Sequence, residues 1–405
     1  MTIRQSPLAA LRSIGRSPGR GTKKRYPHQV AALTSFNEFV GNDEAVQQLR
    51  ASIAAGRLPH SLILSGAAGA GKYTLAIMLA QALNCERQPR EMWSNGQTLA
   101  SFCGICHNCT RIAEAADLAP LVEAAVAARE EMRETDKKET RVLIQTHPDV
   151  LVIPPDPPQL LIKLGQVRKV ISSAQRTPSE GPRKVFLFTS AQFMKEAANS
   201  LLKVLEEPPD FAHLILLAEN PDELLPTIRS RCGLVRLGAI PAEELEMVLA
   251  ERRPEWKPTQ RALVARLSQG AVGKAVGFDV AAYTAARADA MVMLRGATLE
   301  GEHSELFRMT ETYRAGAEGQ QKTSTMLSAM ASVLEDLLML TAGTPERLRN
   351  VDLRSELETM AAAVDFGWIE RAVHGMDKVR SGMRRNLLRS LALDSFAEEM
   401  SGVRR

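Results

Sequence analysis

Short apolar runs alternate with helical patterns over the first two thirds of the chain. Each run is bounded by turn residues and predicts a buried strand; the runs cover residues 61–65, 150–153, 183–188, 213–218 and 235–237. Between them, apolar residues recur three or four positions apart, as on the buried face of a helix. Buried strands that alternate with helices are typical of a parallel sheet with helices on both faces. We therefore expect an α/β domain built on a doubly wound parallel sheet.

After the last predicted strand the pattern becomes purely helical. Helices are expected from Pro241 to Arg253 and over 263–267, followed by a turn at 268–275 that enters another helix. From about residue 278, Ala, Leu and Met recur at helical spacing and predict helices over 281–298, 303–318, 320–341, 351–363, 366–380 and 383–400. Such a Met-rich stripe is more often core than a binding groove. The final part of the chain is therefore expected to be an all-α domain.

The first predicted strand leads into a glycine-rich segment and then into a helix over 75–83. The segment reads Gly66-Ala-Ala-Gly69-Ala-Gly71-Lys72-Tyr73-Thr74. Glycines let backbone N–H groups turn toward a phosphate, the helix N-terminus adds a favourable field, and the lysine reaches the outer phosphates. A Gly/Ala-rich turn without a ligand is the alternative. The spacing G-x-x-G-x-G-K between strand and helix favours a phosphate-binding loop.

Two features weaken the case for nucleotide hydrolysis. The residue after the lysine should carry the hydroxyl that holds Mg²⁺, but it is Tyr73, and the hydroxyl comes one position late at Thr74. The strand over 183–188 should end in carboxylates that order Mg²⁺ and the attacking water. It runs instead into Thr189-Ser-Ala-Gln192, and the nearest acid, Glu196, belongs to the next helix.

Four of the five cysteines form a candidate metal site. They are Cys85, Cys103, Cys106 and Cys109; the fifth is Cys232, expected to be buried structure. Overlapping C-x-x-C units aim several thiolates at one ion, and four thiolates suit a closed, structural, tetrahedral Zn²⁺ site. A redox pair is the rival, although it needs only two cysteines. His107 is the substitute ligand if Cys85 points away. The crowding argues against a disulfide framework and for a reduced compartment.

Charge is concentrated at the N-terminus. Of 51 Lys and Arg residues, seven lie in residues 1–35, which hold no acid; the remaining 44 face 47 acidic residues, so the body carries about −3. Overall charge therefore gives no argument for DNA binding by the body. The basic segment lacks the apolar core of a secretory signal, and we expect it to be disordered. No apolar run approaches the roughly 18 residues needed to cross a bilayer. A charged run over 112–141 predicts one long helix with a solvated face.

Seven stretches stand in a distinctive order along the chain. They are Phe36-x-x-Phe-Val-Gly41, Arg57-Leu-Pro-His60, the Gly66–Lys72 loop, the cysteine set, His147-Pro-Asp149, Ala198-Asn-Ser-Leu-Leu-Lys-Val-Leu-Glu-Glu-Pro-Pro209 and Ser230-Arg-Cys232. In this order they resemble the bacterial clamp-loader subunits of DNA polymerase III, which belong to the AAA+ family. The resemblance covers residues 36–275, and beyond that only the helical class agrees.

The resemblance implies roles for particular residues. The family's zinc ligands map onto Cys85, Cys103, Cys106 and Cys109. The arginine of Ser-Arg-Cys, here Arg231, implies an arginine finger that touches the ATP of a neighbouring subunit. A structural salt bridge is the alternative for Arg231, and Arg229 is a weaker candidate for the same role. Lys274 stands where the family places a sensor residue near its own nucleotide, although a turn lysine is often only solvated.

The family has two relevant branches. Its gamma/tau subunits hydrolyse ATP, whereas its delta-prime subunit is a stator that often loses catalytic residues. Tyr73 and Thr189–Gln192 resemble the delta-prime branch, which implies no intrinsic ATPase activity but membership of the polymerase III holoenzyme. ATP or ADP at the degenerate loop stays possible. An active gamma/tau-type ATPase is the first alternative, and a zinc-dependent nucleic-acid module is the second.

These expectations give a domain plan. It comprises a tail over 1–35, an AAA+ domain over 36–238 with a zinc module at 85–111 and a charged insertion at 112–141, a helical lid over 239–277 and a helical oligomerisation collar over 278–405. The implied partners are gamma/tau and delta clamp-loader subunits, the sliding clamp, and primer-template DNA through the complex, with no membrane contact. The implied location is the bacterial cytoplasm.

Overall fold

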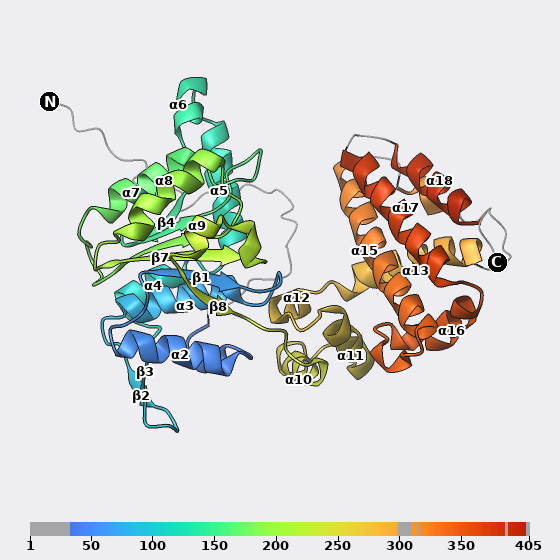
Figure 1. The fold of residues 1–405 in the computed structure, drawn as a ribbon, viewed down its shortest axis with the longest axis horizontal. Coiled ribbons are helices and arrows are strands. Elements are labelled where there is room, and N and C mark those ends of the chain that lie inside the picture. Colours follow the sequence, from blue (N-terminus) through green and yellow to red (C-terminus); the bar gives the residue numbers. More distant parts are fainter. Residues whose placement is uncertain (1–32, 299–308, 314–315, 385–387, 402–405) are drawn as a thin grey trace, which may run out of the picture.

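The computed structural model describes residues 33–298, 309–313, 316–384 and 388–401. Three groups of elements follow one another along the chain (Figure 1): a sheet with helices on both faces, a small group of helices, and a helical bundle. The predicted tail over 1–35 lies outside the described residues except for its last three positions.

A six-stranded sheet forms the centre of the first group. Its order is β4-β5-β6-β7-β1-β8, and every pair is parallel except β4 with β5. The strands are β1 (Ser61–Ser65), β4 (Ile144–His147), β5 (Val150–Ile153), β6 (Lys184–Phe188), β7 (Ala212–Ala218) and β8 (Gly233–Arg236). The expected doubly wound parallel sheet is confirmed. The short strand β4 was missed because only its two end residues are buried.

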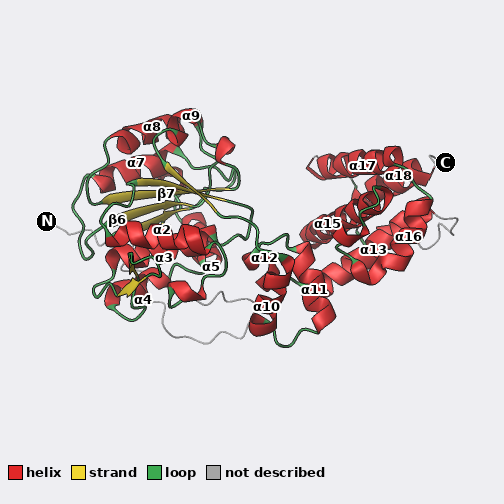
Figure 2. Ribbon diagram, turned by 60° about the horizontal axis from the view of Figure 1, so that its bottom comes forward, coloured by secondary structure: helices red, strands yellow, loops and turns green. Residues whose placement is uncertain are grey.

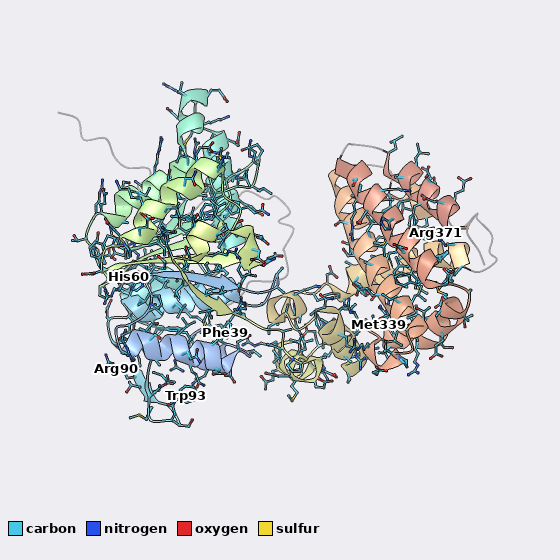
Figure 3. The ribbon with its side chains drawn as sticks, in the orientation of Figure 1. Phe39, His60, Arg90, Trp93, Met339 and Arg371 are labelled. Carbon is cyan, nitrogen blue, oxygen red and sulfur yellow. The ribbon has the colours of Figure 1, made fainter. Side chains whose placement is uncertain are left out.

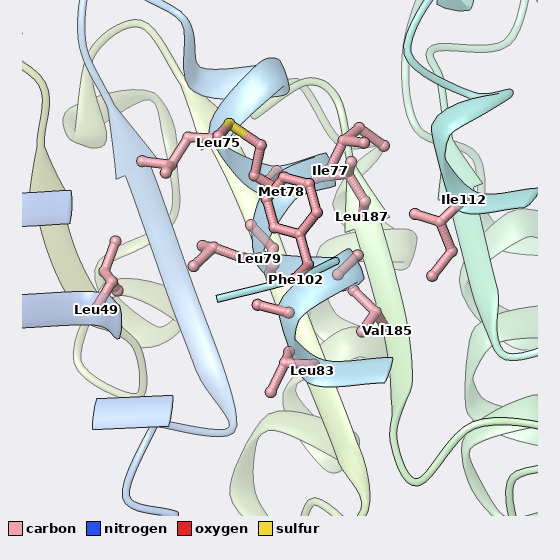
Figure 4. Close-up of a cluster of buried hydrophobic side chains, with 14 of the residues drawn as sticks. Leu49, Leu75, Ile77, Met78, Leu79, Leu83, Phe102, Ile112, Val185 and Leu187 are labelled. Carbon is pink, nitrogen blue, oxygen red and sulfur yellow. The ribbon is translucent and has the colours of Figure 1, made fainter. Parts of the chain in front are cut away.

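Successive side chains of the strands enter two different cores, as the period of two requires. One core joins the sheet to α2 (Asp43–Ala54), α3 (Lys72–Asn84) and α4 (His107–Ala113). The other joins it to α7 (Leu164–Ala174) and α8 (Lys195–Glu206). The two helical layers lie on opposite faces of the sheet (Figure 2). Figure 4 shows the first core, where Leu75, Met78 and Leu79 of α3 pack near Val185 and Leu187 of β6.

Two segments differ from their sequence predictions. Residues 112–141 do not form one helix: α4 ends at Ala113, α5 spans Leu118–Glu130 and α6 spans Glu134–Glu139. Pro120 explains the first break, because proline is tolerated in the first turn of a helix but removes a hydrogen bond from its interior. The charged face is not wholly solvated either, since Arg129 is buried and its guanidinium lies 2.5 Å from Asp156.

Between α3 and α4 the chain forms a β-hairpin that the sequence did not predict. Its strands are β2 (Arg90–Met92) and β3 (Thr98–Ala100), which pair antiparallel. The buried guanidinium of Arg50 in α2 ties the hairpin to the body through the Ala100 carbonyl and the Glu91 carboxylate. The hairpin accounts for the long gap between Cys85 and Cys103.

After β8, all regular elements of the described chain are helices. After the short α9 (Pro226–Arg229), the small group consists of α10 (Ala242–Arg252), α11 (Pro258–Leu267) and α12 (Val272–Val276). The bundle contains α13 (Val280–Thr298), α15 (Gly316–Thr341), α16 (Arg354–Ala362), α17 (Phe366–Arg384) and α18 (Arg389–Ser401). The predicted break at 318–320 is wrong, because α15 runs through it. Most of the helix predicted over 303–318 lies outside the described residues.

One helix reaches the length and hydropathy of a membrane span. It is Lys322–Thr341, whose apolar window is 56% buried inside the bundle. This corrects the expectation that no segment comes near that limit. A single, mostly buried helix of this kind is weak support for a span, because the core helix of a bundle meets the same criteria.

His213 gives the sheet a titratable group in its core. The side chain is 4% exposed, its Nδ1 lies 3.2 Å from the Pro59 carbonyl oxygen, and its ring stacks on His60 (His60 is labelled in Figure 3). Burial lowers the pKa of His213 to about 4, below the usual histidine value of 6.5. The folded state therefore stays neutral at this site while the unfolded chain takes up a proton.

We expect folding stability to fall between pH 6.5 and pH 4, with His213 contributing roughly 3 kcal/mol of the loss. Chemical denaturation across this range, compared with His213→Asn, measures that share. The variant should show a shallower loss than the unmodified chain. If the free energy of unfolding fell equally with pH in the two proteins, His213 would not be the source of the loss.

Candidate functional site

The glycine-rich loop sits at the carboxyl end of β1. Gly66 continues the sheet, since its N–H donates to the Ala218 carbonyl at 3.2 Å, and Gly71 is the N-cap of α3. Gly69 and Gly71 have φ of +80° and +87°, which side chains other than glycine rarely adopt. The loop therefore has the backbone form that the sequence predicted for phosphate binding.

The loop is filled by groups of its own chain. The Lys72 ammonium donates to the carbonyl oxygens of Gly66 at 2.5 Å and Ala67 at 2.9 Å. A Cβ on Gly71 would come within 3.0 Å of the Phe39 ring. Burial lowers the pKa of Lys72, and the carboxylates of Glu219 and Glu223 oppose that shift. The lysine thus has hydrogen-bond partners within its own loop.

Glu219 is a residue that the sequence analysis did not single out. It follows β7, whose last residue Ala218 pairs with Ser65 of β1 immediately before the loop. Parallel strands end at the same sheet edge, so this acid approaches Lys72 although the end of β6 offers none. At the β6 end, the N–H of Thr189 donates to the Ile153 carbonyl and Gln192 bonds to Ser190. Reading the ends of all parallel strands together would have found Glu219.

Tyr73 points away from the loop. Its hydroxyl donates to the Ala115 carbonyl oxygen at 2.5 Å, just beyond α4, and its ring packs on the core around α3. Burial raises the pKa of Tyr73, so the hydroxyl keeps its proton. Thr74 follows in the first turn of α3. The side chain directly after the lysine therefore does not offer its hydroxyl to an ion at the loop.

The small helical group contacts the loop through its backbone. The N–H of Gly273 donates to the Gly69 carbonyl at 2.8 Å, and a Cβ on Gly69 would lie 2.7 Å from the Lys274 nitrogen. The Lys274 ammonium turns the other way and donates to Leu267 at 3.2 Å. Burial lowers the pKa of Lys274, with Arg349 adding to the effect. The structure brings the backbone of Lys274 to the loop, and its side chain to the junction with the bundle.

Arg229 is the last residue of α9, and Arg231 lies in the turn between α9 and β8; both are at the surface. Arg231 donates to the Thr227 carbonyl at 2.8 Å and pairs with Glu206 at 2.7 Å. Arg229 pairs with Asp222. Ion pairs between exposed groups are worth about 0–1 kcal/mol, so the pair with Glu206 does not hold Arg231 against another anion.

The four predicted cysteines converge. The sulfur atoms of Cys85, Cys103, Cys106 and Cys109 all lie within 4.8 Å of one another. Tetrahedral Zn²⁺ with Zn–S bonds of about 2.3 Å separates its sulfurs by about 3.8 Å, so a modest closure would seat the ion. The cluster fits a metal ion such as zinc.

Backbone donors surround the sulfur atoms. Cys85 accepts from the N–H groups of Gln88 and Cys103 at 3.2 and 3.3 Å, and Cys103 accepts from Cys106 at 3.3 Å. Burial raises the pKa of Cys85 and Cys109. At Cys103 burial acts in the same direction, but backbone N–H groups outweigh it and lower the pKa to about 7. These donors suit thiolate sulfur, and a bound cation would offset the burial of its charge.

His107 does not join the cluster. Its side chain is 64% exposed and lies 3.7 Å from Glu180. The His147-Pro-Asp149 motif lies behind the cysteines, where His147 Nε2 is 3.0 Å from Asn108 Oδ1. The Asp149 carboxylate accepts from three N–H groups of residues 179–181. The motif therefore anchors the metal module, residues 85–111, to the sheet. Cys232 packs in the opposite core, away from the cluster.

These features define the class of protein. A glycine-rich loop after the first strand of a parallel sheet, a small helical group against that loop and a C-terminal helical bundle make an AAA+ type fold, with a candidate Cys₄ metal site inserted after the loop helix.

Residues 41–241 match the family described as DNA polymerase III, delta subunit. DNA polymerase III subunit tau of Escherichia coli is 29% identical over 60% of this chain and 32% of its own length. DNA polymerase III subunit delta' of Pseudomonas aeruginosa is 33% identical over 43% of this chain and 41% of its own length. The chain belongs to the family of DNA polymerase III clamp-loader subunits. It spans about a third of the tau relative, and the relatives include both tau and delta' subunits.

A solved structure of a DNA polymerase III gamma subunit-related protein from Thermotoga maritima covers 88% of this chain and 99% of its own. The identity is 15% and the TM-score is 0.40, a likeness too loose to support a conclusion.

The contact between loop and small helical group is testable at Gly69. Gly69→Ala introduces both a strained φ and a clash with the Lys274 backbone, whereas Gly56→Ala introduces only the strain, because Gly56 has φ +64° and open space around it. We expect Gly69→Ala to cost about 1–3 kcal/mol more than Gly56→Ala, the usual range for overpacking. Denaturant unfolding measures both. Equal losses would show that the contact does not form.

Metal binding is testable with a matched pair of cysteine variants. Cys106→Ser should lose the ion and unfold the metal module, since structural metal sites contribute folding energy. Cys232→Ser, remote from the cluster, should keep the metal content of the unmodified chain. Elemental analysis and hydrogen exchange of residues 85–111 report the two effects. Full metal content in Cys106→Ser would rule out this ligand set.

Proposed function

We propose that the chain is a delta-prime-like subunit of the DNA polymerase III clamp loader. It would serve as a stator that holds the assembly and supports ATP-dependent loading of the sliding clamp onto primed DNA. The observation that carries the proposal is the direction of Tyr73, the residue after the loop lysine: its hydroxyl turns away from the loop and bonds to the Ala115 carbonyl.

An ATPase would hold Mg²⁺ with a Ser or Thr hydroxyl at position 73, and the Tyr73 hydroxyl is already bonded to Ala115. A second observation supports a subunit without ATPase activity of its own. The end of β6 carries Thr189–Gln192 in place of carboxylates. ATP or ADP would occupy such a site weakly. Lys274 remains a proposed nucleotide contact, although its ammonium faces Leu267 here.

Arg231 is the proposed arginine finger. Its guanidinium is held only by surface partners, so it is free to exchange Glu206 for a phosphate across a subunit interface. The chemistry it serves would then take place in the neighbouring subunit. A rigid planar cation stabilises the charge that develops on a transferring phosphoryl group.

The remaining parts of the proposal concern cofactor, assembly and location. Zn²⁺ would fill the Cys₄ cluster as a structural ion, because four protein ligands leave no open position for chemistry. The C-terminal bundle would be the collar that binds gamma/tau and delta subunits. Primer-template DNA would be met through the complex, and the location would be the bacterial cytoplasm.

The finger proposal predicts a loss of activity in the assembled complex. Arg231→Ala, assembled with catalytic partner subunits, should slow ATP turnover at the adjoining site by roughly 10³-fold, the low end of the range for arginine fingers. Steady-state ATPase and clamp-loading assays measure the loss.

Arg229→Ala is the matched control. It removes the same charge two residues away, from an arginine that also has a surface carboxylate partner, Asp222, so the two variants differ only in which arginine is lost. It should leave turnover nearly unchanged. Undiminished ATPase and clamp loading in Arg231→Ala would remove the finger from the proposal.

An active gamma/tau-type ATPase is the second candidate, and Glu219 is the observation that favours it. Its carboxylate acts on Lys72 from the adjacent strand end and could replace the acids missing after β6. ATP turnover by the lone chain with Mg²⁺, with and without primed DNA, separates the candidates. We expect none above the level of Lys72→Ala. Turnover that both Lys72→Ala and Glu219→Gln abolish would establish the ATPase instead.

A further inference from the structure

Helix α3 carries the phosphate loop at one end and a metal ligand at the other. Lys72 is its first residue, and Cys85 follows its last residue as the C-cap. All residues from Leu75 to Asn84 are buried, and α4 of the metal module packs along the helix. The two candidate sites therefore share one rigid element.

Four side-chain hydrogen bonds join α3 to the metal module and to the residues just beyond it. In one of them Gln88 Nε2 of the module donates to the Ala82 carbonyl at 3.0 Å. The Tyr73 hydroxyl donates to Ala115 at 2.5 Å, Gln81 Nε2 donates to the Cys109 carbonyl at 3.1 Å, and the Asn84 carbonyl accepts from Asn108 at 2.9 Å. The side chains of Tyr73 and Gln81 lie about 80° apart around the helix axis at 3.6 residues per turn, and Asn84 contributes its backbone carbonyl. Together these contacts form one polar seam between α3 and the segment that follows the cysteines.

The seam touches the cysteine ligands directly. Gln81 bonds to the backbone of Cys109, and Asn108 lies between Cys106 and Cys109 in the first turn of α4. Three of the four bonds thus fix the end of α3 that is near the metal. Only Tyr73 reaches back to the end of α3 that bears the loop.

Tyr73 suits this task because its partner would otherwise be unpaired. Ala115 is 1% exposed and lies just past the end of α4, where carbonyl groups lack helical partners. A buried carbonyl without a donor is costly. The phenol supplies the donor across the gap between α3 and the end of α4, and burial keeps it protonated.

We propose that Tyr73 is a positioning residue that couples metal occupancy to the conformation of the phosphate loop. The ion fixes α4 through Cys106 and Cys109, α4 fixes Ala115, and Ala115 holds Tyr73 and the first turn of α3. Lys72 and the glycine-rich loop are thereby held from the metal side, without a nucleotide. The inference rests on the metal-binding part of the proposed function and is independent of the stator role.

The test is a cycle of two changes, metal removal and Tyr73→Phe, in the full chain. Hydrogen exchange of residues 66–75 is measured in the Zn²⁺-loaded and chelator-stripped forms of both proteins. In the unmodified chain, stripping should speed exchange in this segment by about fivefold or more, the factor that one hydrogen bond of ordinary strength represents. In Tyr73→Phe the loaded form should already exchange faster, and stripping should add little.

Reciprocity supplies a second readout. If bound metal stabilises the loop through Tyr73, then Tyr73 must strengthen metal binding by the same coupling free energy. Zn²⁺ transfer from Tyr73→Phe to a chromogenic chelator should show a zinc affinity lower by a comparable factor. Tyr283→Phe is the matched control: it removes a hydroxyl bonded to Ser332 and Asn350 in the bundle and should change neither zinc affinity nor exchange at 66–75.

Each outcome decides one point. Equal acceleration of exchange on stripping in the unmodified chain and in Tyr73→Phe would overturn the coupling, as would unchanged zinc affinity in Tyr73→Phe. If Tyr73→Phe does not fold, the unmodified chain alone still tests the claim, because exchange at 66–75 that ignores zinc removal contradicts it. Absence of bound zinc in the unmodified chain would refute the metal site itself, and ATP turnover would refute only the stator.

Discussion

The burial of α3 is the constraint on which both candidate sites depend. From Leu75 to Asn84 the helix has no exposed face, because the sheet, α2 and the metal module close around it. Close-packed helices move as bodies, so a shift at Lys72 requires a shift at Cys85. The cysteine-rich module beside this helix therefore packs on the same rigid element that carries the phosphate loop.

The charge of Lys72 is balanced by groups of its own chain. Lys72 is partly buried, and its charge is met by two backbone carbonyls and by the field of Glu219 and Glu223. A bound phosphate would add to these partners or replace them, and Lys72 is the group through which the loop would respond to it.

Much of the architecture could be predicted from the sequence. The central strands are apolar on both faces, and runs such as Val150–Ile153 are hard to interpret otherwise. The four cysteines converge because two of their gaps are set by tight turns. Arg129 was assigned to a solvated face because its partner Asp156 lies far along the chain, and no local pattern reports a buried ion pair. Pro120 indicates a helix start near residue 118, but the long run of charged residues favoured one continuous helix in the prediction.

Other features required coordinates. The roles of Gln81 and Asn108 depend on which carbonyl lies opposite each side chain. The sequence does not show whether a polar residue in an apolar helix is buried or exposed. Lys274 occupies the expected position in the chain, yet its side chain leaves the loop because Leu267 offers an acceptor on the other side. Sequence position predicted where its backbone lies, and side-chain direction came from packing.

The bond from Gly273 to Gly69 has a consequence for any ligand of the loop. The Gly69 carbonyl accepts from the Gly273 N–H, and a Cβ at Gly69 would meet the Lys274 backbone. The small helical group therefore orients this peptide, so a rotation of the group would turn the peptide and change the backbone form of the loop. Occupancy of the loop and the position of the small helical group are then linked, and each would bias the other.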